Sequence, residues 1–279
     1  MMKQQFLILT VLIAPTLPLF TSDFASFIDK NFGIKIRKKL GRSDIGHDDR
    51  SSFGGKAFPS DRSKKTRWEQ NKPVVFVHGV TLKAAAFRAH CHFFKLNGYT
   101  SADLYATTYG DGGTTSAMDT AVDCNFIKQM RDMFVAVYKY VGRKINVITW
   151  SMGSVISRKA ILGGNCTETG ERLGDPITYM VHTFLTVGGV NYGMQRCPRR
   201  MKACNSLNSM RCDSALMRYE GDRSFAIYGD RDTIVGRSCC GRVCGELKNA
   251  NASFLKPHLN HICIFYKTLQ LQYNLLNDG

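Results

Sequence analysis

The sequence predicts an α/β protein in which a mostly parallel sheet is flanked by helices. Short, continuous apolar runs at residues 74–77 and 145–148 are typical of parallel strands that are buried on both faces. Segments with apolar residues at helical spacing follow such runs, and the longest of them covers residues 118–141. With 279 residues the chain is long enough to bury a core of this kind as one domain.

The elements of this core are expected to alternate from Pro73 onward. Strands are predicted at residues 74–77, 101–105, 144–149, 183–187 and 223–228, and helices at 84–96, 118–141, 154–162 and 259–276. Asn97-Gly98 and Gly142 are typical ends for the first two helices. Residues 193–221 carry three cysteines and little periodicity, so we expect a disulfide-held excursion above the sheet, where binding loops or lids tend to lie.

Two segments precede the core. Lys3 is followed by an apolar stretch that prolines interrupt, so residues 1–22 are predicted to be a signal peptide with a cleavage point near residues 20–25. Residues 23–72 form a basic, polar lead-in, with 13 basic and 6 acidic side chains between positions 26 and 72. We expect this lead-in to be partly disordered and partly wrapped on the surface of a domain that spans residues 73–279.

Cysteine usage and charge indicate the compartment and exclude some partners. Ten cysteines, an even number compatible with five disulfides, and glycosylation sequons at Asn165 and Asn251 favour a secreted protein without a transmembrane span. The sequence His90-Cys91-His92 is rich in metal-ligand types, but no paired C-x-x-C motifs occur, and we expect neither a metal nor another cofactor. The balance of 38 basic and 22 acidic residues would allow transient contact with lipid surfaces, although basic residues of this kind are more often simply solvated, and the chain has no basic motif typical of a nucleic-acid module.

The segment 149–153, with the sequence T-W-S-M-G, is the main indication of chemistry. It stands between a buried strand and a predicted helix, which is the layout of a nucleophile elbow with Ser151 at its tip. A sharp turn lifts a serine hydroxyl clear of the sheet, toward a base that can accept its proton. Thr149 departs from the commonest form of this motif, which has glycine at that position.

A serine nucleophile needs a histidine, and the histidine needs an acid that orients it. Of the three histidines after Ser151, His182 precedes every candidate acid, whereas His261 stands at a loop-to-helix junction and is preferred over His258. Asp230 and Asp232 both follow the strand predicted at 223–228, and either could be the acid. The oxyanion donors are expected to be the backbone N–H groups of Val80, after the first core strand, and of Met152, and His78 is expected to hold the first of these loops.

Longer blocks of sequence resemble one family. The segments 52–55, 73–81, 105–113 and 151–164 together resemble class 2 lipases of the α/β-hydrolase superfamily, and more closely the secreted, cysteine-rich lipases of nematodes. The resemblance covers roughly residues 50–276. It implies an α/β-hydrolase fold with Ser151 as nucleophile, His261 as base and Asp232 as acid, the last because Ile227-Tyr228…Asp232…Val235-Gly236 matches the family pattern.

Two functions of different classes therefore remain open. The first is a secreted serine-dependent lipase or carboxylesterase that hydrolyses lipid esters, such as acylglycerols, through an acyl-enzyme. The alternative is a catalytically weak or inactive secreted protein that binds anionic lipids or glycans through its 16 surplus positive charges. The joint presence of serine, acid, base and oxyanion loop favours the enzyme.

Overall fold

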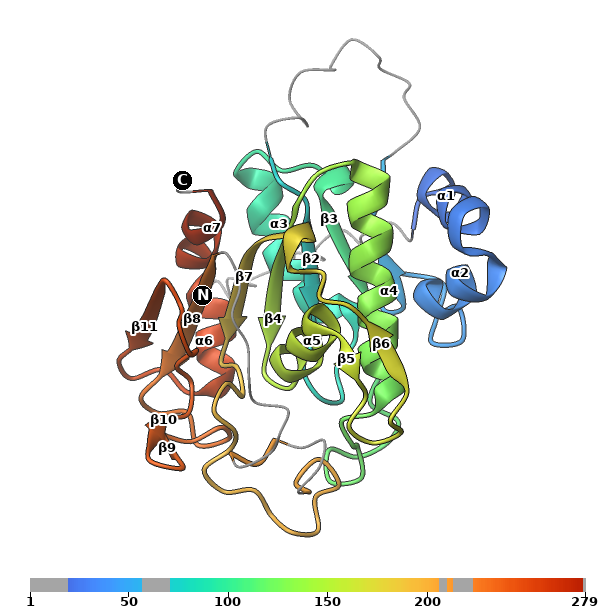
Figure 1. The fold of residues 1–279 in the computed structure, drawn as a ribbon. Coiled ribbons are helices and arrows are strands. Elements are labelled where there is room, and N and C mark those ends of the chain that lie inside the picture. Colours follow the sequence, from blue (N-terminus) through green and yellow to red (C-terminus); the bar gives the residue numbers. More distant parts are fainter. Residues whose placement is uncertain (1–19, 57–70, 206–209, 213–222, 278–279) are drawn as a thin grey trace, which may run out of the picture.

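A seven-stranded sheet with the strand order β1-β3-β2-β4-β7-β8-β11 forms the centre of the protein (Figure 1). The structure is a computed structural model that describes residues 20–56, 71–205, 210–212 and 223–277. The strands of the sheet are β1 (Ser52–Phe53), β2 (Val74–Val77), β3 (Leu104–Thr107), β4 (Ile145–Trp150), β7 (Val181–Val187), β8 (Ser224–Gly229) and β11 (Ala252–Lys256). Every neighbouring pair is parallel except β1 with β3, so the mostly parallel sheet is confirmed.

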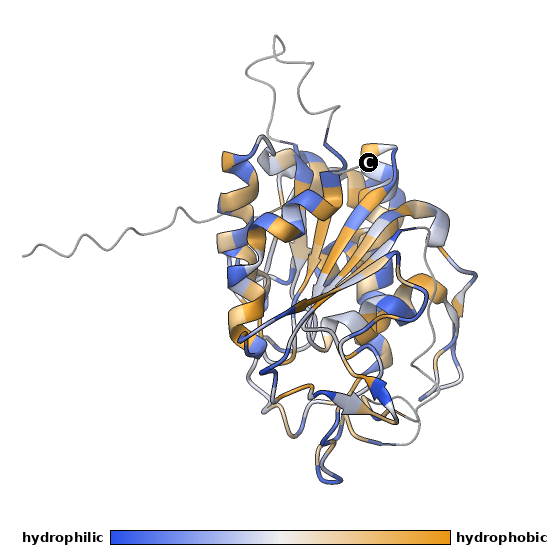
Figure 2. Ribbon diagram, turned by 90° about the vertical axis from the view of Figure 1, so that its left-hand side faces the viewer, coloured by the Kyte–Doolittle hydropathy of each residue, from blue (hydrophilic) through white to orange (hydrophobic). Residues whose placement is uncertain are grey.

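Helices cover both faces of this sheet, and each face has its own apolar core. Successive side chains of β2 point to opposite faces of the sheet. Val75 and Val77 therefore belong to one core, and Val74 and Phe76 to the other. The first core includes residues of α4 (Cys124–Val141) and α5 (Gly153–Leu162). The second includes residues of α3 (Arg88–Leu96), α6 (His261–Lys267) and α7 (Leu269–Asn277). The strands between these layers are hydrophobic along much of their length (Figure 2).

Several predicted boundaries were wrong for local reasons. The helix expected from residue 118 begins only at Cys124, because Asp123 caps it by accepting the N–H of Asn125. The helix expected over 259–276 is two helices that meet at Thr268. A 3-10 turn forms the start of the segment 84–96, and another occupies residues 101–103 ahead of β3. Short hairpins, formed by β5 (Gly164–Asn165) with β6 (Arg172–Gly174) and by β9 (Ser238–Cys239) with β10 (Arg242–Val243), were not predicted.

The lead-in differs most from expectation. Residues that were expected to be partly disordered form two helices, α1 (Ser22–Phe32) and α2 (Ile34–Gly41), which lie beside α4 (Figure 1). Phe24, Ile28 and Leu40 are fully buried in the same core as the inner face of α4. Spacing of apolar residues by four positions, after a helix-capping Thr21, was the available signal. Residues 1–19 of the predicted signal peptide and the basic cluster at 64–67 lie outside the described residues.

The ten cysteines form four disulfides rather than five. The pairs are Cys124–Cys166, Cys197–Cys204, Cys212–Cys240 and Cys239–Cys244. Cys91 and Cys263 are free thiols. Cys91 lies on α3 and is completely buried in the second core. Burial raises the pKa of the Cys91 thiol well above its ordinary value. In the part of the chain that the structure describes, no helix is both long and apolar enough to cross a membrane.

Candidate active site

Ser151 occupies the turn between β4 and α5, at the carboxyl end of the sheet. Its backbone has a φ of +54°, in the left-handed region that non-glycine residues rarely adopt. Two hydrogen bonds hold the turn: the Ser151 N–H donates to the Val187 carbonyl at 3.2 Å, and the Ser154 hydroxyl donates to the Ser151 carbonyl at 2.7 Å. The strained turn has the backbone geometry expected of the nucleophile elbow that the sequence motif predicts.

Two glycines allow the elbow to pack against the neighbouring loop. A Cβ at Gly153 would lie 2.4 Å from the His78 carbonyl oxygen and 2.7 Å from that of Val77. A Cβ at Gly79 would lie 2.8 Å from the Trp150 ring. Because both contacts are shorter than real Cβ atoms show, only glycine lets the serine turn and the loop after β2 approach this closely.

Thr149, the departure from the commonest motif, fits within the regular strand β4. Its side chain is fully buried, and its hydroxyl donates to the Leu185 carbonyl on β7 at 3.3 Å. The residue pairs in register with Thr186, so the β-branched side chain occupies an ordinary sheet position. The sharp turn at Ser151 therefore forms in spite of the threonine.

A chain of two hydrogen bonds joins Ser151, His261 and Asp232. His261 Nδ1 lies 2.7 Å from Asp232 Oδ2, and His261 Nε2 lies 3.0 Å from Ser151 Oγ. A carboxylate can only accept, so we assign the ring proton to Nδ1, which leaves Nε2 free to accept from the serine hydroxyl. All three residues are at most 6 % exposed. Residues separated by up to 110 positions thus form one buried hydrogen-bonded chain.

The loop after β8 fixes the orientation of the Asp232 carboxylate. Its Oδ1 accepts the N–H groups of Ile234 at 3.0 Å and Val235 at 2.9 Å, in an Asx-type turn. Oδ2 is left for the histidine. Oδ1 therefore stabilises the turn, and Oδ2 contacts the imidazole of His261.

His261 is the first residue of α6, as its loop-to-helix position suggested. Asn260 caps the helix by accepting the Cys263 N–H at 2.8 Å. The Trp150 ring packs against the imidazole with centroids 5.0 Å apart. A Cβ at Gly188 would lie 3.3 Å from the imidazole, so glycine at this position leaves room for the ring. The Trp150 contact and the bond to Asp232 hold the imidazole beside Ser151.

The alternates from the sequence lie outside this hydrogen-bonded chain. The Asp230 carboxylate accepts the backbone N–H of His258 at 2.6 Å, so both residues belong to a turn between the loops after β8 and β11. His258 is exposed. His182 lies on β7, where its Nδ1 contacts the Thr183 hydroxyl at 2.9 Å.

The loop after β2 is held by His78. Its Nε2 accepts the Tyr109 N–H at 3.0 Å, so Nδ1 carries the proton and donates to the Gly79 carbonyl at 2.8 Å. The ring also stacks on Tyr109, with centroids 4.0 Å apart, and the Tyr109 hydroxyl donates to the His78 carbonyl. Burial lowers the pKa of His78 to about 4, which keeps the ring neutral in this role. His78 therefore supports the loop, as the sequence suggested.

Val80 and Met152, the predicted oxyanion donors, stand at the two sides of the elbow. Val80 follows His78-Gly79 in the loop just described, and Met152 is the N-cap residue of α5. Within the described residues, neither backbone N–H donates a hydrogen bond to the protein. The Met152 side chain is fully buried in the core of α4 and α5. Two backbone N–H groups without a protein acceptor, close to the Ser151 hydroxyl, are the arrangement that an oxyanion would require.

Gln195, which sequence reasoning missed, holds the backbone behind the acid. Its side-chain oxygen accepts the N–H of Arg237 at 2.7 Å, and its backbone N–H donates to the Val235 carbonyl at 2.8 Å. A Cβ at Gly236 would lie 2.3 Å from the Gln195 Cβ. The start of the cysteine-rich excursion therefore packs directly on the segment after Asp232. No local motif marks such a contact, so the sequence held no signal for it.

The fold and this site define an α/β hydrolase. The family model described as "Lipase (class 2)" matches residues 71–274, and the chain therefore belongs to this family of carboxylic-ester hydrolases. None of the curated proteins compared matches the sequence.

Solved structures show the same fold at low identity. One is the mature form of the Bacillus licheniformis lipase BlEst2, with 15 % identity and a TM-score of 0.54, over 74 % of this chain and 92 % of that one. Another is the thermophilic esterase Est2 of Thermogutta terrifontis, with 14 % identity and a TM-score of 0.52, over 81 % of this chain and 86 % of that one. At such identities the likeness concerns the fold alone.

Proposed function

We propose that the protein is a secreted, serine-dependent lipase or carboxylesterase that hydrolyses lipid esters, with acylglycerols as its substrates. The observation that carries this proposal is the hydrogen-bonded chain from Ser151 Oγ through His261 to Asp232, with the serine on a strained turn. Membership in the class 2 lipases supports the ester substrate.

In the first half of the reaction Ser151 attacks the ester carbonyl. His261 Nε2, 3.0 Å from the hydroxyl, accepts its proton, and Asp232 stabilises the imidazolium that forms. The N–H groups of Val80 and Met152 donate to the oxyanion, a contribution for which removal of one donor typically costs about two to three orders of magnitude in turnover. The tetrahedral intermediate then collapses as His261 gives the proton to the leaving alcohol.

In the second half water replaces the alcohol. His261 takes a proton from the water, the hydroxide attacks the acyl-enzyme carbonyl, and the same two N–H groups stabilise the second oxyanion. Return of the proton to Ser151 Oγ releases the fatty acid. The protein's own groups carry every proton transfer, so the mechanism requires no metal or organic cofactor.

Secretion and glycosylation form part of the proposal. Four disulfides are compatible with an oxidising compartment. Both predicted acceptors, Asn165 and Asn251, are exposed. Exposed basic side chains on α2, Lys35 and Lys38, are available for transient contact with a lipid surface.

The test is hydrolysis of short- and long-chain p-nitrophenyl esters by the secreted protein and by its Ser151→Ala variant. We expect activity that disappears in the variant, while circular dichroism shows that the variant is folded. A folded wild type without activity on any chain length would contradict the proposal. It would favour instead the binding of anionic lipids or glycans by the basic surface.

A further inference from the structure

A cavity of about 620 Å³ lies beside the oxyanion loop, and the triad residues are not among those that line it. Thr81 and Leu82, which directly follow Val80, form part of its wall. The glycine-rich loop from Tyr109 to Gly113 forms another part, and the first turns of α4 a third. A Cβ at Gly113 would lie 2.3 Å from the Thr81 carbonyl oxygen, so the glycine-rich loop packs directly on the oxyanion loop.

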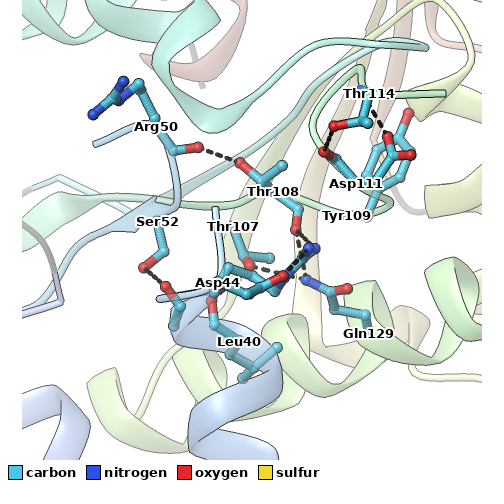
Figure 3. Close-up of polar contacts among 12 residues, drawn as sticks. Leu40, Asp44, Arg50, Ser52, Thr107, Thr108, Tyr109, Asp111, Thr114 and Gln129 are labelled. Atoms are coloured by element: carbon cyan, nitrogen blue, oxygen red, sulfur yellow. Dashed lines mark hydrogen bonds and ion pairs between the residues drawn. The ribbon is translucent and has the colours of Figure 1, made fainter. Parts of the chain in front are cut away.

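A further part of the wall comes from α2 and the residues after it, which are anchored to the end of β3 (Figure 3). The Thr107 hydroxyl donates to the Leu40 carbonyl at 2.6 Å. Arg42 donates through Nη1 to the Thr108 carbonyl at 2.6 Å, and Gln129 of α4 donates to the same carbonyl at 2.9 Å. The helix α2 lies before residues 71–274, which match the family model. This part of the wall is therefore formed by residues outside the segment that matches the family.

Charges along the cavity wall balance. Four basic side chains line it: Lys38, Lys39, Arg42 and Lys202. Four carboxylates also line it: Asp44, Asp111, Asp119 and Asp123. Equal numbers of the two signs give the cavity no net charge that would favour either an anion or a cation.

Most of these charged groups already have protein partners. Arg42 pairs with Asp44 at 2.7 Å, and Lys39 pairs with Asp132 at 2.9 Å. Asp111 accepts hydrogen bonds from its own loop, chiefly from the Thr115 hydroxyl, which lowers the pKa of its carboxyl. Among the residues described, Lys38 and Lys202 make no ion pair.

The cavity also has an apolar part, formed by Leu82, Tyr109 and Phe126. The Tyr109 and Phe126 rings lie 5.4 Å apart at an interplanar angle of 41°. Hydrogen-bond donors, hydrogen-bond acceptors and aromatic rings thus line the same cavity. A fatty acyl chain would desolvate the charged groups of the wall, including Lys38 and Lys202, which make no ion pair among the described residues. Hydroxyl groups can both donate and accept, so they match a wall of mixed donors and acceptors.

We propose that this cavity binds the alcohol part of the ester and takes a neutral, hydroxyl-rich head group, such as glycerol or a monosaccharide. The inference rests on the proposed function, because it places one side of the ester at Val80 and extends the alcohol past Thr81 into the cavity. The acyl chain then lies on the other side of the carbonyl. The class of substrate is an acyl polyol with an uncharged head group.

The test compares esters that share one acyl chain and differ in the alcohol: 6-O-octanoylglucose and methyl octanoate. We expect the wild type to favour the glucose ester by about tenfold in kcat/KM. Asn125 lines the cavity on the first turn of α4 and is exposed. Asn125→Trp fills part of the cavity, and we expect it to lower the ratio of the two kcat/KM values about tenfold.

Asn31→Trp, an exposed substitution on α1 outside the cavity, is the matched control and should leave this ratio unchanged. An unchanged ratio in Asn125→Trp would overturn the proposal. So would a tenfold preference of the wild type for an anionic ester, 1-octanoylglycerol 3-phosphate, over the glucose ester.

A binding measurement distinguishes an error in the cavity assignment from an error in the proposed hydrolase function. Ser151→Ala protein, titrated with octyl β-glucoside below its micellar concentration, should show saturable binding that Asn125→Trp weakens about tenfold. If no ester is hydrolysed but this binding is seen, the proposed function is wrong and the cavity assignment stands. If esters are hydrolysed and octyl glucoside does not bind, the cavity assignment is wrong alone.

Discussion

The turn that carries Ser151 and the loop that carries Asp232 are held in place by different kinds of interaction. Close packing that only glycine permits holds the serine turn, because a Cβ at Gly153 or Gly79 would collide with the facing segment, more than 70 residues away in the sequence. Hydrogen bonds hold the acid loop, since Gln195 binds the backbone there from 40 residues upstream of Val235. The glycines of the serine turn can therefore be recognised in the sequence, whereas the contacts that support the Asp232 loop can be seen only in the three-dimensional structure.

This contrast implies different responses to substitution. A methyl group on the serine turn meets rigid backbone, so small changes there should have large effects. Loss of a contact behind the acid leaves Asp232 with its own Asx-type turn, so changes there should be graded. The substitutions below probe the two sides in order of decreasing effect.

The largest effect is expected for Asp232→Asn, which replaces the group that accepts from His261 Nδ1. The amide favours the wrong tautomer of the imidazole, and kcat should fall by about 10⁴-fold. The measurement is the steady-state rate on p-nitrophenyl octanoate.

Asp230→Asn is the matched control, because the Asp230 carboxylate accepts the His258 N–H and lies outside the hydrogen-bonded chain of Ser151, His261 and Asp232. We expect a change of less than about threefold, in line with surface substitutions. If the effects of the two variants were reversed, Asp230 would be the acid and the proposed assignment would be wrong.

Gly153→Ala tests the steric part of the comparison. Its Cβ meets two carbonyl oxygens at 2.4 and 2.7 Å, so the backbone must move. We expect a loss of about 1–3 kcal/mol in the free energy of unfolding and about 10²-fold in kcat/KM. Denaturant titration and ester hydrolysis measure the two quantities.

Gly41→Ala provides the control, since no atom lies within 4 Å of a Cβ at that position. Its free energy of unfolding should stay within about 0.5 kcal/mol of the wild type. Equal losses in both variants would show that the elbow has no special need for glycine.

Gln195→Ala should have a smaller effect, because it removes one acceptor from the backbone behind Asp232. We expect kcat to fall about threefold to tenfold, and Gln195→Glu, which keeps an acceptor oxygen, to restore most of it. The neighbouring Arg196→Ala should leave kcat unchanged. Loss of stability without any change in kcat would reduce Gln195 to a purely structural role.

The smallest effect at neutral pH concerns His78. Its pKa is about 4 in the folded protein and about 6.5 when unfolded, so the unfolded chain binds more protons between these values. Because protonation of His78 favours the unfolded chain, the free energy of unfolding is unaffected by this group above pH 6.5. It falls as the pH drops from 6.5 toward 4, by about 3 kcal/mol in total. NMR titration of the His78 ring should show a neutral imidazole down to about pH 4; a midpoint near 6.5 would contradict the buried support of the loop.

The sequence was sufficient for much of the fold because parallel strands buried on both faces leave continuous apolar runs, as in Val74–Val77. The lead-in helices were missed because their basic residues dominate the composition, although Phe24 and Ile28 already had helical spacing. The placements of Ser151 and His261 followed from local patterns. The choice between Asp230 and Asp232 required the family resemblance, since turn aspartates two residues apart look alike in sequence.

Other features depend on tertiary contacts that no short pattern encodes. The cavity wall formed by α2 requires Leu40 to meet Thr107, 67 residues away. Free Cys91 could not be told from its disulfide-bonded counterparts, because only burial in the core separates it from a partner.

The central claim is that Ser151 is a nucleophile activated by His261, and covalent labelling with a fluorophosphonate tests it most directly. The account predicts that one equivalent reacts and that mass spectrometry locates the adduct on Ser151. His261→Ala should slow the reaction by at least about 10²-fold, in keeping with loss of a general base. A folded wild-type protein that stays unlabelled, or one labelled at another serine, would contradict the account.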